Sequence, residues 1–189
     1  MLAHDQGGLL NAAKLAAGLG VSGQSVARYL DLLVDLMLVL RLPPWHANVG
    51  KLQVRSPKVY IRDAGLTHAL LRLEIRGALL GHPVVGGSWE CLCIENLIAA
   101  APRGTEANFY RSSAGAEIDL ILKLPDHPLW AIEVKRSTAP KVTRGFHIAA
   151  DDLAVAERLL VYAEDRDVLG QGGVRAMPAA NAMDRLRAF

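Results

Sequence analysis

Two neighbouring apolar segments constrain the fold of this chain most strongly. Residues 117–123 read Glu-Ile-Asp-Leu-Ile-Leu-Lys, residues 129–135 read Leu-Trp-Ala-Ile-Glu-Val-Lys, and a Pro-Asp-His-Pro turn lies between them. Proline cannot donate a hydrogen bond to a strand ladder, so the two prolines end both runs. The pattern therefore predicts an antiparallel hairpin at the centre of the second half of the chain.

The charged residues of these strands are expected to meet. Side chains alternate between the two faces of a strand, so Glu133 and Lys135 share one face. The neighbouring strand presents Glu117 and Asp119 in the same way, and a hairpin can bring Asp119 next to Glu133. Two carboxylates held close together in a partly dry site repel each other unless a cation lies between them. We therefore expect Asp119 and Glu133 to bind Mg²⁺ or Mn²⁺, which prefer hard oxygen ligands.

Such a metal suits the hydrolysis of a phosphodiester. It lowers the pKa of a bound water and offsets the charge that builds on the phosphate during attack. Lys135 lies where it could orient that water or neutralise the transition state. An Asp followed by Glu-x-Lys is thus one arrangement that would hydrolyse nucleic acid.

The elements around the hairpin indicate the fold class. A helix is predicted from residue 88 to about 100 and a strand at 108–111. After the hairpin, a helix is predicted at 151–157 and a buried strand at 158–162. This α-β-β-β-α-β order predicts an α/β (α+β) domain with a mixed sheet, and the segment after Gly170 is too weakly patterned to assign.

The first half carries the signals of capped helices. Asn11 is a predicted N-cap for a helix over 12–17, Ser22 for the next helix, and Asp63 for a short helix that begins at Ala64. In the helix after Ser22, a periodic apolar face is predicted to be core. The residues of this face are Val26, Leu30, Leu33 and Met37.

Two strands, predicted at 38–42 and 58–62, follow these helices. The order of two helices and a hairpin predicts a winged helix-turn-helix domain over residues 1–79. Residues 77–87 contain four Gly and one Pro and are expected to connect it to a second domain over 80–189.

Composition narrows the class of protein. The chain is 51% hydrophobic and 21% charged, as a globular protein is, and its net charge of +2 does not decide for or against nucleic acid. No apolar run approaches the roughly 20 residues of a membrane span, and the first residues lack a signal-peptide pattern. We expect a cytoplasmic protein without a membrane partner, in which Cys91 and Cys93 are reduced core thiols.

The sequence resembles the PD-(D/E)xK nuclease core at these positions. Asp119 precedes Glu133-Val134-Lys135 by fourteen residues, after a helix that carries Gly87-Ser88-Trp89-Glu90. By position, the resemblance implies that Glu90, Asp119, Glu133 and Lys135 form the catalytic site. It also implies a restriction-endonuclease-like fold for the second domain.

From about Leu10 to Tyr162 the chain resembles the C-terminal part of bacterial and archaeal AAA-type ATP-binding proteins, in which a winged helix precedes domain of unknown function 4143. The stretches that carry this resemblance are Ser56 to Tyr60, Asp63 to Leu66, and Tyr110 to Asp119. The sequence contains no Gly-x-x-x-x-Gly-Lys-Ser/Thr motif, so no ATP site is expected in it. An ATPase module, in a parent chain or a separate protein, is the partner that the resemblance implies.

Three functions remain open at this point. They are a metal-dependent nuclease or nuclease-like DNA-binding protein, a non-catalytic interaction module for an ATPase, and a winged-helix transcription regulator. Expected nucleic-acid contacts are Gln24, Ser25 and Arg28 of the second helix, Arg55, Lys58 or Arg62 of the wing, and Arg111, Arg136, Lys141 and Arg144 near the nuclease-like face.

Structural roles compete with each of these assignments. Glu90 would be favoured in the first turn of a helix whatever the function. Glu117 can simply be the ion-pair partner of Arg111. Asp31 and Asp35 would repel phosphates if the second helix lay deep in a DNA groove.

Overall fold

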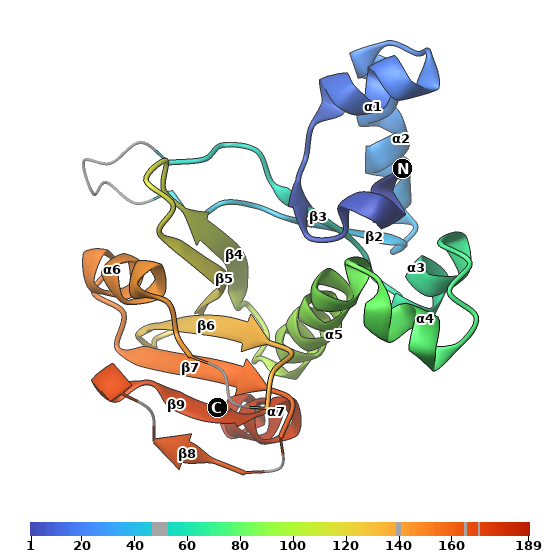
Figure 1. Cartoon of the computed structure of the whole chain (residues 1–189). Coiled ribbons are helices and arrows are strands. Elements are labelled where there is room, and N and C mark those ends of the chain that lie inside the picture. The colour runs from blue at the N-terminus through green and yellow to red at the C-terminus, as the bar shows by residue number, and fades with distance from the viewer. Residues whose placement is uncertain (47–52, 139–140, 165, 170) are drawn as a thin grey trace. The chain divides into compact units, whose positions relative to one another are not determined.

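The computed structural model describes residues 1–46, 53–138, 141–164, 166–169 and 171–189 (Figure 1). The chain forms two compact units. The first consists of Met1–Leu42 and Ser56–Leu92, and the second of Pro43–Arg55 and Cys93–Phe189. Over the described ranges the chain is mixed α/β, with seven α-helices and two sheets.

The first unit contains the helices and strands that the sequence predicts. Its elements are η1 (Leu2–Asp5), β1 (Gly8–Leu9), α1 (Ala12–Leu19), α2 (Gly23–Asp35), β2 (Val39–Leu42), β3 (Lys58–Ile61), α3 (Ala64–Leu70) and α4 (Arg76–Gly81). The strands form an antiparallel sheet in the order β1-β3-β2. Strand β1 and helix η1 were not anticipated, because two or four residues carry no readable period.

The three predicted N-caps are confirmed. Asn11 Oδ1 accepts a hydrogen bond from Lys14 N at 2.9 Å, and Ser22 Oγ accepts one from Ser25 N at 3.1 Å. Asp63 Oδ1 accepts one from Leu66 N at 2.6 Å. Each cap satisfies one of the N–H groups that a helix leaves without an internal partner, so each local sequence fixes where its helix begins.

The predicted core face of α2 is correct for its first half and wrong at its end. Val26 and Leu30 are buried, whereas Met37 is 63% exposed. Helix α2 ends at Asp35, and Met37 adopts a left-handed conformation with φ of 59°. The N–H of Leu38 then donates to the carbonyl of Leu33, which closes the helix end and takes Met37 off the helical phase.

The glycine-rich stretch at 77–87, which was predicted to connect two domains, is largely helical. It contains most of α4 and the start of α5 (Val84–Ala100), which begins four residues earlier than predicted. At Gly87 a Cβ would collide with the carbonyl of Gln6. This glycine therefore permits close packing of the helix against the backbone of Gln6.

The second unit is built on a six-stranded mixed sheet, which confirms the predicted sheet type. Its strands are β4 (Glu106–Arg111), β5 (Glu117–Lys123), β6 (Leu129–Lys135), β7 (Glu157–Tyr162), β8 (Val168–Leu169) and β9 (Arg175–Pro178), in the order β4-β5-β6-β7-β9-β8. Strands β5 and β6 form the predicted antiparallel hairpin, with Leu122 opposite Trp130. Strands β6, β7 and β9 are parallel to one another.

The helix predicted at 151–157 lies elsewhere. Helix α6 spans Arg144–Asp152 and lies against β5 (Figure 1), where Phe146 is fully buried. Thr143 caps its start by accepting from Phe146 N at 3.2 Å, and Ala154 turns the chain with φ of 49°. The prediction was wrong because it took no account of the threonine cap and therefore placed the helix after the apolar residues that belong to it.

Two further parts of the second unit were not predicted. Strand β9 and helix α7 (Ala179–Arg187) occupy the unassigned C-terminal segment, and Arg185 of α7 pairs with Glu157 of β7 at 2.8 Å. Residues 43–45 also lie along β4, because Trp45 N donates to Phe109 O at 2.6 Å and Phe109 N donates to Pro43 O. Neither feature has a local sequence signal, since both depend on pairing with distant strands.

Candidate metal and nucleic-acid site

The two central carboxylates lie inside the sheet of the second unit. Asp119 in β5 is 6% exposed and Glu133 in β6 is 4% exposed. Their sequence neighbours on each strand are also buried, among them Leu120 and Ile132. Strand alternation lets the apolar residues fill the core while both acids project to their own side.

The hairpin register brings the acids together. Paired residues run from Lys123 and Leu129 to Leu120 and Ile132, and Asp119 and Glu133 are the residues that follow this last pair on each strand, close enough for the charge of Asp119 to act on Glu133. At that point the N–H of Val134 donates to Asp119 Oδ2 at 3.0 Å. The carboxylate thus takes the place of a backbone acceptor, which satisfies a buried N–H and fixes Asp119 beside β6.

Lys135 completes the group. Its Nζ lies 2.7 Å from Glu133 Oε1, and its side chain is 37% exposed. The two residues are i and i+2 on β6, as the alternation predicted. A partly exposed ammonium group therefore lies directly beside a buried carboxylate.

The electrostatics of this group are unfavourable for two negative charges. Burial, followed by the charge of Asp119, raises the pKa of Glu133 from 4.5 to about 7. The hydrogen bond and charge of Lys135 oppose this rise, and Glu117 adds a smaller increase to the pKa. A cation that bound between Asp119 and Glu133 would therefore reduce the repulsion between their carboxylates.

Glu117 and Arg111 form a partly exposed pair at the edge of this region. They are opposite each other in the register of β4 and β5, with Arg111 Nε and Glu117 Oε2 3.6 Å apart. This is the ion pair that the sequence allowed for Glu117. The same contact offsets part of the positive charge that Arg111 was predicted to offer a nucleic acid.

Glu90 belongs to the first unit, where it lies in α5. Its Oε1 accepts hydrogen bonds from Lys58 Nζ at 3.0 Å and from Tyr60 OH at 2.6 Å. Only 5% of the Lys58 side chain is exposed, so its prediction as a DNA contact on the wing is wrong. The role of Glu90 in the catalytic site stays a prediction. The i, i+2 spacing of Lys58 and Tyr60 on β3 was the signal that they share a face.

The other predicted nucleic-acid residues divide by exposure. Exposed side chains are Gln24, Arg28, Arg55, Arg136, Lys141 and Arg144, and Arg62 is half-buried. The hydroxyl of Ser25 lies 3.0 Å from that of Ser22, so it belongs to the cap of α2. Arg144, in the first turn of α6, lines a cavity of about 380 Å³ together with Ser112 and Gly115.

The donor set fits a hydrated divalent cation better than a closed metal cage. In the part of the chain that the structure describes, no group of three or more His, Cys, Asp or Glu is placed to hold a metal. Mg²⁺ commonly uses one or two carboxylates and fills its other positions with water or phosphate oxygens. Asp119 and Glu133 match that minimal set of hard ligands.

Comparisons with known proteins indicate the family. The model for a domain of unknown function (DUF8612) matches residues 1–76, and that for a domain of unknown function (DUF4143) matches residues 85–182. Uncharacterized proteins of Mycobacterium bovis and Mycobacterium tuberculosis are each 41% identical over 179 residues.

That match covers 95% of this chain, which spans only 40% of the length of each of these relatives. No solved structure matches the chain. Among the described residues, no helix is long and apolar enough to cross a lipid bilayer. Because the second family model covers more than half of its residues, the chain belongs to the DUF4143 family.

Proposed function

We propose that the chain is a metal-dependent nuclease, or a nuclease-like DNA-binding protein, of the PD-(D/E)xK type. One observation carries the proposal. Asp119 and Glu133 are buried on adjacent strands, and the ammonium group of Lys135 lies 2.7 Å from Glu133. A fold that only needed a core would not place two acids there, since buried charges destabilise a fold unless they are compensated.

Asp119 and Glu133 are the residues that would hold the metal. When bound, Mg²⁺ or Mn²⁺ would supply a water of lowered pKa and positive charge opposite a phosphate. The hydrogen bond from Val134 N keeps the Asp119 carboxylate in place before any ligand arrives. Such pre-positioning reduces the reorganisation that binding would otherwise require.

The remaining residues would orient the nucleic acid. Lys135 is partly exposed, so it can turn from Glu133 toward a phosphate oxygen once a metal neutralises the acids. Arg136, Lys141 and Arg144 follow β6 and are exposed. These residues would neutralise backbone phosphates without reading bases, so the expected binding is strong at low salt and weakly sequence-dependent.

The test combines cleavage with metal binding. Plasmid and linear DNA are incubated with Mg²⁺, Mn²⁺ or EDTA and with the wild type, Asp119→Asn or Glu133→Gln. Glu106→Gln is the matched control, since Glu106 is an exposed β4 residue. We expect metal-dependent cutting by the wild type and the control alone. Calorimetric titration with Mn²⁺ should show a site that Asp119→Asn removes, and equal cutting by all four proteins would refute the proposal.

We further propose that the first unit is a winged helix, supported by the order η1, β1, α1, α2, β2, β3 and by its three-stranded antiparallel sheet. A transcription regulator would use α2 to read DNA. The exposed surface of α2 carries Tyr29, Leu32 and Leu36 as well as Arg28. This composition favours the interaction-module alternative over the regulator.

A further inference from the structure

The strongest unassigned feature is an apolar stripe on the outside of α2. Tyr29, Leu32 and Leu36 are 60%, 53% and 58% exposed. Tyr29 and Leu32 lie in α2 and Leu36 is its C-cap residue, and their spacings of three and four residues place them on one side of the helix. Met37 and Leu38 extend the exposed apolar surface beyond its end. We define Tyr29, Leu32 and Leu36 as the outer stripe.

The outer stripe adjoins the buried side of the same helix. At 100° per residue, the arc from the outer stripe to Val26, Leu30 and Leu33 covers roughly 160° of the circumference. Gln24, Arg28, Asp31 and Asp35 lie in the remaining part, whereas Ser25, which is half-buried, falls within the arc between Leu32 and Leu36. From this arc, Val26 and Leu30 belong to a buried core cluster of the first unit, whereas Tyr29, Leu32 and Leu36 are exposed.

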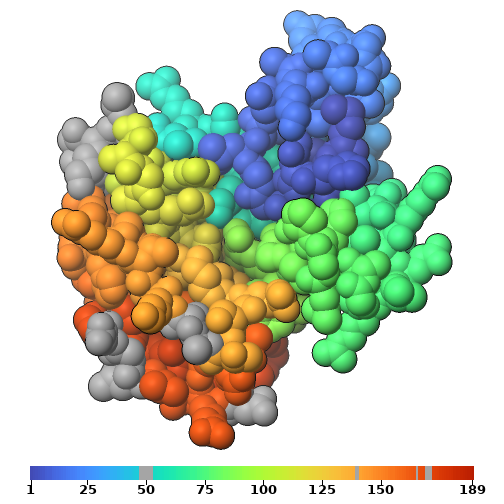
Figure 2. Space-filling model, in the orientation of Figure 1, coloured from blue at the N-terminus to red at the C-terminus, as the bar shows by residue number. Residues whose placement is uncertain are grey.

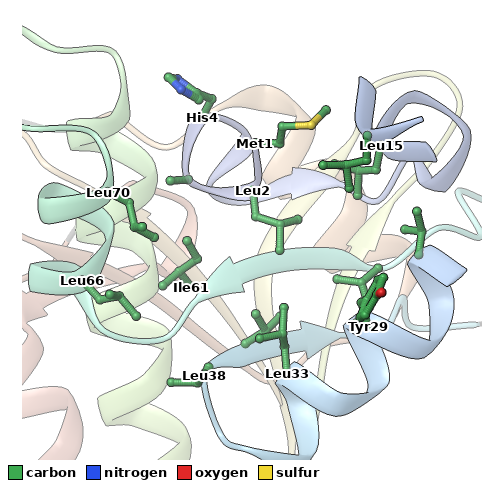
Figure 3. Close-up of a pocket in the computed structure, with 15 residues that line it drawn as sticks. Met1, Leu2, His4, Leu15, Tyr29, Leu33, Leu38, Ile61, Leu66 and Leu70 are labelled. Carbon is green, nitrogen blue, oxygen red and sulfur yellow. The ribbon is translucent and has the colours of Figure 1, made fainter. Parts of the chain in front are cut away.

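A cavity of about 390 Å³ lies beside the stripe within the first unit. Tyr29 and Leu33 line it from α2, Leu2 from η1, and Leu66 and Leu70 from α3 (Figure 3). The imidazole of His4 and the hydroxyl of Tyr29 are the polar side-chain groups among its lining residues. Its size and apolar lining are those of a recess that accepts apolar side chains.

Exposed apolar residues also continue onto the neighbouring helices. Leu70 of α3 is 59% exposed, and Ile75 and Leu80 beside it in sequence are exposed as well. The segment that carries them is green in Figure 2 and lies at the surface of the face shown. Scattered apolar residues on a surface are ordinary, but a helical stripe next to an apolar cavity marks an interaction site.

The length of the relatives indicates what covers this surface. Each mycobacterial relative is matched over only 40% of its length, so a larger region of each lies outside the match. We propose that the outer stripe and the adjoining cavity dock an amphipathic segment of that larger region. In helix-in-groove docking, a docked amphipathic helix places its apolar side chains in an apolar recess, and the cavity beside the outer stripe is such a recess. The inference does not depend on nuclease chemistry at Asp119 and Glu133.

Hydroxyl-radical footprinting tests the proposal. The chain is compared alone and joined to the remaining region of the Mycobacterium tuberculosis relative, in the order found in that protein. We expect oxidation of Tyr29, Leu32 and Leu36 to fall severalfold in the joined protein. Val168, which is 52% exposed in the second unit, should be oxidised equally in both. Equal oxidation of the outer stripe in the two proteins would overturn the proposal.

Variants distinguish docking on the outer stripe from pairing of two copies of the chain. The exposed substitutions Leu32→Ser and Leu36→Ser together should leave the fold of the chain intact and restore oxidation of Tyr29 in the joined protein, whereas Val168→Ser should not. If the chain alone forms a dimer in sedimentation that Leu36→Ser disperses, the surface pairs two copies and the proposal is wrong. If the joined protein does not fold, the test uses the relative itself. Amide hydrogen exchange of the helix that matches α2 is measured in the full relative and in the part of it that matches this chain. Equal exchange rates in the two proteins would refute docking.

Discussion

The clearest quantitative consequence of the structure concerns the protonation of Glu133. Its pKa is raised from 4.5 to about 7, first by burial and then by the charge of Asp119. One pKa unit corresponds to about 1.4 kcal/mol, so ionising Glu133 in the folded chain costs roughly 3 kcal/mol more than in the unfolded chain. Glutamine has the same shape and no charge, so Glu133→Gln should remove this cost.

The direction of the pH dependence follows from the raised pKa. Between about pH 4.5 and 7 the folded chain binds more protons at Glu133 than the unfolded chain does. The extra protonation of Glu133 in the folded chain therefore stabilises the fold. This stabilisation is complete below pH 4.5 and is lost as the pH rises through about 7. From pH 5 to pH 8, the unfolding free energy of Glu133→Gln should rise relative to the wild type by up to roughly 3 kcal/mol. Because the side chain of Lys135 is 37% exposed, solvent screening reduces the free energy that its ion pair with Glu133 contributes to folding.

Two measurements check this prediction. Carbon NMR of the glutamate carboxyl groups should give a midpoint near 7 for the resonance that disappears in Glu133→Gln. Urea unfolding at pH 5, 6, 7 and 8 should show the two stability curves diverging, with Trp130 in β6 as a reporter inside the same sheet. Glu106→Gln is the control with an exposed carboxylate. A midpoint near 4.5, or parallel stability curves, would refute the reasoning.

Three further predictions address the metal and the packing of the first unit. Saturating Mg²⁺ should lower the pKa of Glu133 in the same NMR titration, and an unchanged midpoint would contradict metal binding. Lys58→Met should destabilise the chain by about 1–3 kcal/mol because Glu90 loses its buried cationic partner, measured by thermal unfolding against Lys123→Met as an exposed control. Gly87→Ala should cost about 1–3 kcal/mol through its collision with Gln6, and Gly86→Ala, with open space around its Cβ, should cost less.

Local chemistry made several elements predictable. The helix starts at Asn11, Ser22 and Asp63 were correct because a cap is a short-range hydrogen bond. The β5–β6 hairpin was correct because its alternation and its prolines agree. The predicted juxtaposition of Asp119 and Glu133 depended on that hairpin alone, so the centre of the candidate site was accessible without tertiary information.

The errors occurred where distant contacts decide the outcome. The helix predicted from Ser88 begins earlier, at Val84, and Gly87 lies inside it, where the missing side chain allows the close approach of Gln6. Lys58 looked like an exposed wing residue because its partner Glu90 lies 32 positions away. Met37 was predicted to be core because it continues the apolar spacing of α2. The helix ends before Met37, and Met37 itself adopts a left-handed conformation.

The sequence by itself determined the central strands, the helix caps and the acidic pair with its lysine, since each depends on alternation or on contacts within a hairpin. Only the tertiary structure decided that β9 and α7 complete the second unit and that Lys58 and Tyr60 hold Glu90. It also decided that Tyr29, Leu32 and Leu36 are exposed. The physical reason is that burial and ion pairing depend on which residues are neighbours in space. The spacing of apolar residues along one segment does not specify those neighbours.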